Sequence, residues 1–227
     1  MSAVCSRKPQ ASNAVLNATF EPSQAYRIPK IMTADDGKKK ARAAVQAMFD
    51  RYKLLASQRP KGHIDFDSAV MNNMKIVDAG PEGSVEFELY IAPNFSNLNN
   101  VMHGGAAGVI FDMSTTIALC PVARPGFWEF MGGVTRSLNI SYLKAVPIGT
   151  TVRLVSRVTS VGKQMAMIRG EMTSLDGKTT FCTVEHHKVN VPVLLDHLNA
   201  RIPWDDEFEK EWGVVKGKTK IGLKSKM

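Results

Sequence analysis

The chain has 227 residues, 44% of them hydrophobic, which is enough for one domain with extensions or for two small domains. Its net charge of +8 is uneven, because residues 1–63 hold 12 of the 29 Lys and Arg residues and 4 of the 21 acids. This stretch lacks the interleaved aromatic side chains of a nucleic-acid-binding surface, so we expect no nucleic-acid partner. A solvated arm is favoured over a basic rim that attracts a polyanion. The cysteines Cys5, Cys120 and Cys182 form no disulfide framework or metal-binding spacing, which favours a reducing compartment.

The N-terminal part of the chain divides into an arm and a helix. Residues 1–35 are predicted to be a poorly ordered arm, because Ser, Asn, Ala and Pro mix there without a hydrophobic period. The arm lacks the long apolar run of a secretory signal and the several arginines of a transit peptide. Thr33 and Asp36 have the spacing of a helix-capping pair. The amphipathic helix predicted after this pair ends at Arg59-Pro60 and has its apolar residues at Val45, Met48, Phe49, Tyr52, Leu55 and Ala56.

From Ala69 onward the hydrophobic period changes toward two, which predicts strands. Two strand candidates are joined by a hairpin signal at residues 80–83. Four more follow a loop rich in Pro and Gly, and turn signals separate them. The six predicted strands cover residues 71–79, 84–92, 134–146, 151–161, 164–175 and 179–191.

An apolar helix with a single acid is predicted between the second and third strands. Residues 101–119 open with Gly104 and Gly105 and then run almost wholly apolar, with Asp112 as the only acid. A helix that is apolar on every face is buried, and a buried unpaired carboxylate is costly, so Asp112 is expected to have a partner or a function. The segment is too short and too polar to predict a membrane span. Antiparallel strands around one apolar helix predict an α+β fold in which the sheet wraps the helix.

His103 and Asp112 stand nine positions apart on this helix. At about 100° per residue they lie on opposite faces and roughly 13 Å apart along the axis, so they cannot serve one small site together. Two antiparallel copies of the helix across a two-fold axis would let each copy lend Asp112 to the N-terminus of the other. The sequence therefore favours a site shared between subunits.

Residues 192–227 lie outside this layout and are interpreted as a C-terminal extension. Trp204, Phe208 and Trp212, with acids between them, predict a short helix docked on the surface. The chain ends in Ser225-Lys226-Met227, a tripeptide close to the Ser-Lys-Leu peroxisomal address. Peroxisome and cytoplasm are therefore the two expected locations.

Polar residues recur at fixed spacing around the apolar helix. The pattern Asn-x5-His-Gly-Gly-x6-Asp is followed by a strand with further matching residues: Asn97, His103-Gly104-Gly105, Asp112, Gly133-Val134-Thr135 and Asn139-Ile140-Ser141-Tyr142-Leu143. With these motifs the chain resembles the hotdog-fold acyl-CoA thioesterases of the 4-hydroxybenzoyl-CoA thioesterase superfamily, particularly the phenylacetate-pathway type and the animal member 2 type. The resemblance implies a hotdog domain over residues 36–191, including the leading amphipathic helix. It also implies a homodimer or a dimer of dimers.

The resemblance assigns a chemical role to each matching residue. It makes Asp112 the catalytic carboxylate, as general base on water or as nucleophile, and Gly104 the backbone N–H donor to the thioester carbonyl. Asn97 and His103 would orient the substrate and the donor loop, and Thr135 would help to position water. The reaction passes through a tetrahedral oxyanion, which the free N–H groups and positive dipole of a helix N-terminus stabilise.

Structural interpretations of the same residues stay open. His103 could bond the backbone where the loop meets the helix, Asn97 could cap a turn, and Thr135 could be an ordinary strand residue. Gly104 and Gly105 could serve close packing, although Gly105 is also a candidate for substrate binding.

Four basic residues are candidates for binding the phosphates of a coenzyme, although each fits better as a solvated strand residue. They are Arg136, Lys144, Lys163 and Lys188. Cys120 and Cys182 have no His or acid at a telling spacing, so no thiol nucleophile is expected.

The resulting prediction is a homo-oligomeric acyl-CoA thioesterase that releases free acid and CoA without a metal or bound cofactor. One rival is a hotdog hydratase or dehydratase, whose His and acid stand in a different arrangement. The other is a catalytically silent hotdog module that binds acyl groups or protein partners. The presence of Asn97, Gly104 and Asp112 together argues against silence.

Overall fold

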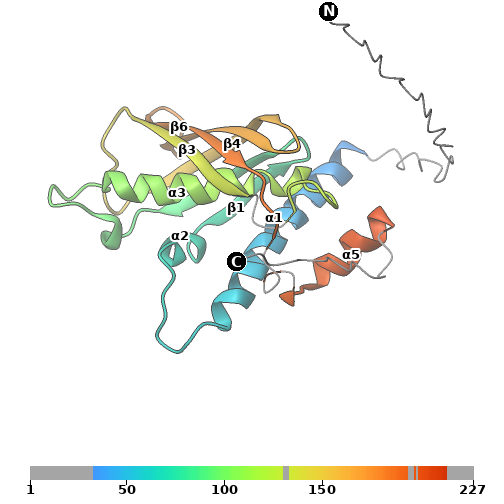
Figure 1. Cartoon of the computed structure of the whole chain (residues 1–227). Helices are drawn as coiled ribbons and strands as arrows, with labels where there is room; N and C mark the ends of the chain where they lie inside the picture. The colour runs from blue at the N-terminus through green and yellow to red at the C-terminus, as the bar shows by residue number, and fades with distance from the viewer. Residues whose placement is uncertain (1–32, 130–132, 194–196, 198, 214–227) are drawn as a thin grey trace, which may run out of the picture. The chain divides into compact units, whose positions relative to one another are not determined.

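A six-stranded antiparallel sheet covers one long helix in the computed structural model of the chain (Figure 1). The structure describes residues 33–129, 133–193, 197 and 199–213, all of which belong to the unit Met32–Met227. The predicted arm lies almost wholly outside these residues, as does the C-terminal tripeptide. The predicted α+β hotdog layout is confirmed.

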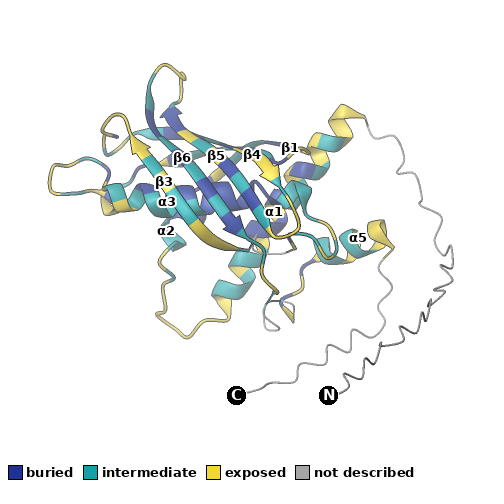
Figure 2. Cartoon of the chain, turned by 45° about the horizontal axis from the view of Figure 1, so that its top comes forward, coloured by how far each residue is buried: buried dark blue, intermediate teal, exposed yellow. Residues whose placement is uncertain are grey.

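The strand order is β1-β2-β4-β5-β6-β3, which makes β1 and β3 the two edges of the sheet. Residues alternate between the helix-facing side and the solvent side, as in any strand. Figure 2 shows the buried residues on the central helix and on the strands that cover it. The strands are β1 (Lys75–Gly80), β2 (Ser84–Tyr90), β3 (Val134–Tyr142), β4 (Thr151–Val161), β5 (Met165–Ser174) and β6 (Thr180–Val189).

The central helix α3 (Gly104–Ile117) packs against the inner face of the sheet. Its approach requires Gly170 on β5, because a Cβ there would lie 2.9 Å from Val184 Cγ1 and 3.2 Å from Thr115 Cγ2. By length and composition the stretch Gly104–Val122 is apolar enough to cross a membrane, but 56% of it is buried inside the domain. Such burial is typical of a core helix.

The helix α1 (Ala34–Ser57) begins at the predicted cap. Thr33 Oγ1 accepts a hydrogen bond from Asp36 N, and the Asp36 carboxylate accepts one from Thr33 N, which completes a capping box. Its apolar face packs on β1, and the ring of Phe49 meets the ring of Phe87 edge-on at 6.0 Å. The predicted amphipathic helix is therefore confirmed.

The C-terminal helix α5 (Pro203–Trp212) carries the three predicted aromatic residues, and Arg51 of α1 pairs with its Asp205. Two predicted strand boundaries are wrong. Met71 ends the short helix α2 (Ser68–Met71) instead of starting a strand, and β1 begins at Lys75. The strand β3 ends at Tyr142 because Leu143 and Lys144 both donate their amides to Phe181 O.

Three short elements complete the described residues. The turns η1 (Pro93–Phe95) and η2 (Cys120–Val122) flank α3, and each has a proline at its start, where the missing amide is no loss. The helix α2 packs its buried Val70 and Met71 against the domain near α3.

Candidate active site

The N-terminus of α3 presents backbone N–H groups where the oxyanion donor is predicted. His103 caps the helix, since its Nδ1 accepts a hydrogen bond from Gly105 N at 2.9 Å. This geometry supports the interpretation that His103 bonds the backbone. It also means that the Gly105 amide already has an acceptor within the chain. The Gly104 amide, at the first helical position, has no acceptor among the described residues. The Gly104 carbonyl accepts from Tyr142 Oη at 2.8 Å, which ties this turn to β3.

Asn97 organises the loop that leads into α3. Its Oδ1 accepts hydrogen bonds from Asn99 N at 2.8 Å and from Val101 N at 3.3 Å. Within the same loop, Asn100 adopts a left-handed backbone with φ of 56°, a conformation that Asn tolerates better than most residues. The Asn97 side chain therefore caps a turn through Oδ1, and its Nδ2 group is the part left for a substrate.

Asp112 lies two turns beyond Gly104, and its side chain is 44% exposed. The expectation that Asp112 is buried is wrong, but the expected partner is present. Thr135 Oγ1 on β3 donates to Asp112 Oδ1 at 2.8 Å. The carboxylate is exposed because β3 is an edge strand, so the described part of the chain leaves this side of α3 open. The structure thus brings together two of the predicted site residues.

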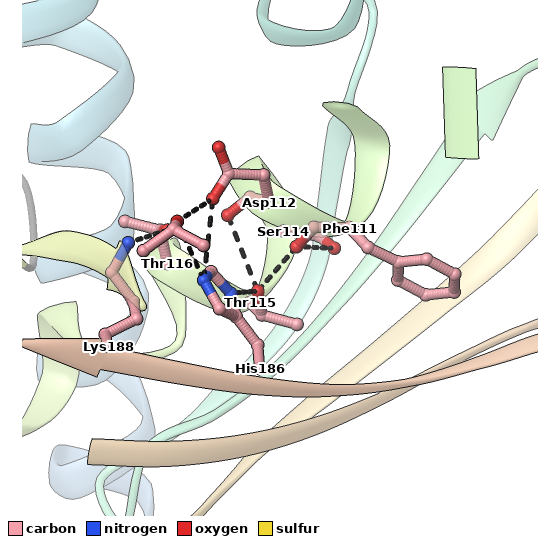
Figure 3. Close-up of polar contacts among 8 residues, drawn as sticks. Phe111, Asp112, Ser114, Thr115, Thr116, His186 and Lys188 are labelled. Carbon is pink, nitrogen blue, oxygen red and sulfur yellow. Dashed lines mark hydrogen bonds and ion pairs between the residues drawn. The ribbon is translucent and has the colours of Figure 1, made fainter. Parts of the chain in front are cut away.

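A buried histidine that the sequence analysis missed joins this pair. His186 on β6 is fully buried, with Nε2 2.9 Å from Thr135 Oγ1 and 3.6 Å from Asp112 Oδ1. Its Nδ1 lies 2.6 Å from Thr115 Oγ1, one turn after Asp112 on α3 (Figure 3). The Thr115 hydroxyl also lies 2.5 Å from Phe111 O, and its single proton can go to only one of these two acceptors. With that proton directed to His186 and the imidazole proton on Nε2, the contacts form a directional chain: Thr115 donates to His186, His186 to Thr135, and Thr135 to the carboxylate.

The position of Lys188 corrects its predicted role. We expected a solvated strand residue or a ligand of coenzyme phosphates, but the side chain is 3% exposed. Its Nζ donates to Thr116 Oγ1 at 2.8 Å, on the inner face of the sheet. Burial lowers the pKa of Lys188 to about 8, while the charge of Asp112 opposes that shift.

The other basic candidates stay on the surface. Arg136 is exposed on β3, Lys163 is exposed in the turn between β4 and β5, and Lys144 follows β3. Burial raises the pKa of Cys120 to about 12, which disfavours a thiolate nucleophile there. Among the described residues, no group of three or more His, Cys, Asp or Glu side chains is arranged to hold a metal ion.

One signal in the sequence could have located His186 and Lys188. Successive strand residues face opposite sides of a sheet, and Val184 is apolar and belongs to the core. The same face must then hold residues 186 and 188, whatever their polarity. The charge of Lys188 concealed this alternation, because lysine is rarely buried.

Gly104 begins α3, and Asp112 lies about two turns further along the same helix. Eight residues separate them, which corresponds to about 12 Å along the axis. One chain therefore presents the free helix N-terminus and the carboxylate at two separate places, each of which lacks the other component.

Comparisons with known proteins show which sequences and folds this chain is similar to. Residues 99–181 match the family model of the Thioesterase superfamily. The solved structure of thioesterase superfamily member 2 from Mus musculus has a TM-score of 0.51 and 19% identity, over 66% of this chain and 96% of that chain, which shows the shared fold. The chain therefore has the fold of that structure, and residues 99–181 are similar in sequence to the Thioesterase superfamily.

Two curated relatives are similar in sequence to part of this chain. Acyl-coenzyme A thioesterase 13 from Homo sapiens is 26% identical over 105 residues, which cover 46% of this chain and 71% of that protein. The protein of the same name from Mus musculus is 26% identical over 111 residues, which cover 49% and 73% of the two chains.

Proposed function

We propose that the protein is an acyl-CoA thioesterase that hydrolyses an acyl-CoA to a free acid and CoA, at a site formed between two copies of the chain. The observation that carries the proposal is the half-exposed Asp112 carboxylate, which Thr135 and His186 hold at the open side of α3. The family match and the similarity to acyl-coenzyme A thioesterase 13 support the substrate class.

Asp112 is suited to activate water. Thr135 donates to Oδ1, and Oδ2 has no hydrogen bond among the described residues, so Oδ2 is available to accept a proton. Water attacks the thioester carbonyl as its proton passes to the carboxylate. The tetrahedral oxyanion then collapses, the C–S bond breaks, and the departing CoA sulfur takes a proton from Asp112. This sequence returns the carboxylate to its starting state.

The oxyanion needs donors that the helix of the same chain cannot supply near Asp112. The Gly104 amide of a second copy meets this need, because it is an unused donor at a helix N-terminus where the dipole favours negative charge. Asn97 Nδ2 of that copy lies in the loop beside this terminus and is the second candidate donor.

The edge strand β3 offers the contact that would join the two copies. Val134 and Tyr142 are exposed on it, and its outer edge is unpaired in the described chain. Antiparallel pairing of two β3 strands across a two-fold axis would extend the sheet and set the two α3 helices antiparallel. Each Asp112 would then face toward the helix N-terminus of the other copy.

The first test measures release of free thiol from short, long and aromatic acyl-CoAs. We expect wild-type turnover with at least one class, and a loss on the order of 10²-fold or more in kcat for Asp112→Asn with the dimer retained. Release of thiol that is unaffected by Asp112→Asn would rule out this mechanism. Binding of acyl-CoA without release would instead favour the silent binding module.

A second test isolates the oxyanion donor. Gly104→Pro removes the amide N–H at the first helical position, where proline is well tolerated, and the preceding His103 already has the extended backbone (ψ of 138°) that proline favours. We expect a loss on the order of 10²–10³ in kcat.

Gly104→Ala is the matched control for this substitution, because it keeps the amide and places a Cβ at an ordinary 3.5 Å from the Tyr142 ring. Its kcat should stay within a few-fold of wild type. Equal damage by the two substitutions would show that space, and not the N–H group, matters at Gly104.

A further inference from the structure

The inner face of β6 carries a cation that the proposed reaction does not use. Lys188 is 3% exposed, and its Nζ donates to Thr116 Oγ1 at 2.8 Å. Thr116 follows Asp112 by four residues, so the two side chains share one face of α3. Figure 3 shows Lys188 and His186 extending from β6 toward this turn of the helix, beside Asp112.

The strands beside Lys188 supply no counter-charge. Its register partners are Thr135 on β3 and Ala166 on β5, and neither carries a charge. The titratable groups near it are Asp112 from α3 and His186 from the same face of β6. His187 also acts on His186 but points to the opposite face, where its Nε2 lies 3.0 Å from Glu185 Oε1. Asp112 is thus the carboxylate that compensates the ammonium.

Burying the Lys188 ammonium costs free energy, and its charge also acts on the ionisable groups beside it. Burial is the main cause that lowers the pKa of His186 to about 4, and the charge of Lys188 lowers it further, against the opposing charge of Asp112. Near neutral pH the cluster therefore holds a neutral imidazole between an ammonium and a carboxylate. A protonated His186 would instead pair directly with Asp112 Oδ1, 3.6 Å away, and would compete for the negative charge that activates water.

Building on the proposed function, we propose that Lys188 is a positioning residue, whose buried ammonium holds a fixed positive charge beside His186 and anchors, through Thr116, the turn of α3 that follows Asp112. It acts through the electrostatics of the cluster and through Thr116, without touching the substrate. The neutral imidazole is then left to orient the Thr135 hydroxyl toward the carboxylate.

Lys188→Met tests this role, since methionine has a similar length and carries no charge. Asp112 is 44% exposed and stays solvated without the ammonium, so the substitution leaves no uncompensated buried charge and a folded protein is expected. The acid limb of the pH profile of kcat/KM should move to higher pH, because His186, no longer repelled by the ammonium, takes up a proton at higher pH and then pairs with Asp112 Oδ1. At pH 6 the activity should fall more than at pH 8.

Imidazole NMR of the full-length protein gives a readout that does not depend on turnover. The titration midpoint of His186 should rise in Lys188→Met, since the repulsive charge is gone. Lys178→Met, in the exposed turn between β5 and β6, removes one positive charge at the surface and should change neither the pH profile nor the titration.

The two readouts separate the possible failures. Suppose that the wild type is active, and that neither the acid limb nor the His186 titration moves in Lys188→Met. This result would overturn the role of Lys188 and leave the proposed function intact. Absence of thiol release in the wild type would overturn the proposed function, while the shift of His186 would still support the electrostatic role. If Lys188→Met does not fold, the wild type alone tests the inference. The His186 resonances should shift as Lys188 loses its proton near pH 8. Resonances that do not shift at that step would overturn the inference.

Discussion

At the scale of single residues, His186 couples the chemistry of the site to the stability of the fold. Its pKa in the folded protein is lowered to about 4 from 6.5, mainly by burial. Above pH 6.5 the ring is neutral in both the folded and unfolded states and contributes no pH dependence. As the pH falls from about 6.5 to about 4, the unfolded state binds a proton that the folded state does not, so stability decreases.

We therefore expect the free energy of unfolding to fall over this window by at most about 3 kcal/mol from this residue. Urea denaturation at a series of pH values measures the slope. His186→Gln removes the titrating group and should flatten the dependence, whatever its effect on absolute stability. An unchanged slope in that variant would show that other groups cause the acid sensitivity.

Thr135 permits a sharper test of orientation. Thr135→Val keeps the shape of the side chain but removes the hydroxyl that donates to Asp112 Oδ1. A hydrogen bond to a charged group contributes about 1.5–3 kcal/mol, so kcat should fall on the order of 10- to 100-fold. Thr135→Ser restores the donor and should recover most of the rate. If Thr135→Val turns over at the wild-type rate, the hydroxyl has no part in the reaction.

The residues of the site differ in how well the sequence could predict them. Gly104, Asp112 and Thr135 belong to one motif and its neighbouring strand, so their order alone pointed to a common region. His186 is 74 residues from Asp112 in sequence and lies near it only because β6 pairs with β3 in the sheet that covers α3. The prediction for Lys188 was wrong because it considered only the cost of burying a charge. The alternation of side chains along β6 places residue 188 on the inner face of the sheet whatever its charge.

At the scale of the elements, Gly133 controls where β3 begins. It has φ of 71°, and a Cβ on it would lie 2.1 Å from Val189 O on β6. Gly133→Ala should displace the start of β3 and with it Thr135, so both thermal stability and kcat should decrease.

Gly177→Ala is a matched control in the turn between β5 and β6. Gly177 has a similar φ of 70°, but a Cβ on it would meet no atom within 4 Å. Only the cost of the left-handed backbone, about 1 kcal/mol, is therefore expected. Thermal unfolding of both variants, with kcat measured in parallel, compares the two costs. Equal losses of stability would show that the contact with β6 is unimportant.

Helices and strands with strong local signals were predictable, and their exact ends were not. The box at Thr33 and Asp36 located the start of α1, and the period of apolar residues identified α5 and four of the strands closely. Tertiary contacts decided the rest. The chain turns after Tyr142 because two amides bond Phe181 O, a partner about 40 residues away that no local pattern reveals.

At the scale of the whole molecule, the exposed edge of β3 predicts a dimer on which activity depends. If turnover requires two copies, specific activity should decline as the protein is diluted below its dimer dissociation constant. Val134→Lys places a charge on that edge, where charges oppose strand pairing, and should raise the concentration needed for activity. Analytical ultracentrifugation and activity measured over the same concentrations test the link. Full activity of a monomer would exclude the shared site.

The separation of Gly104 and Asp112 along one helix has a genetic consequence. Each proposed site takes Asp112 from one copy and the Gly104 amide from the other, so Gly104→Pro and Asp112→Asn would each inactivate both sites of a homodimer. A mixed dimer with one copy of each variant would have one site that carries both substitutions and one site that carries neither. Random exchange of equal amounts gives about half mixed dimers, so two dead proteins together should regain about a quarter of wild-type activity. Two defective alleles in one cell would then complement each other.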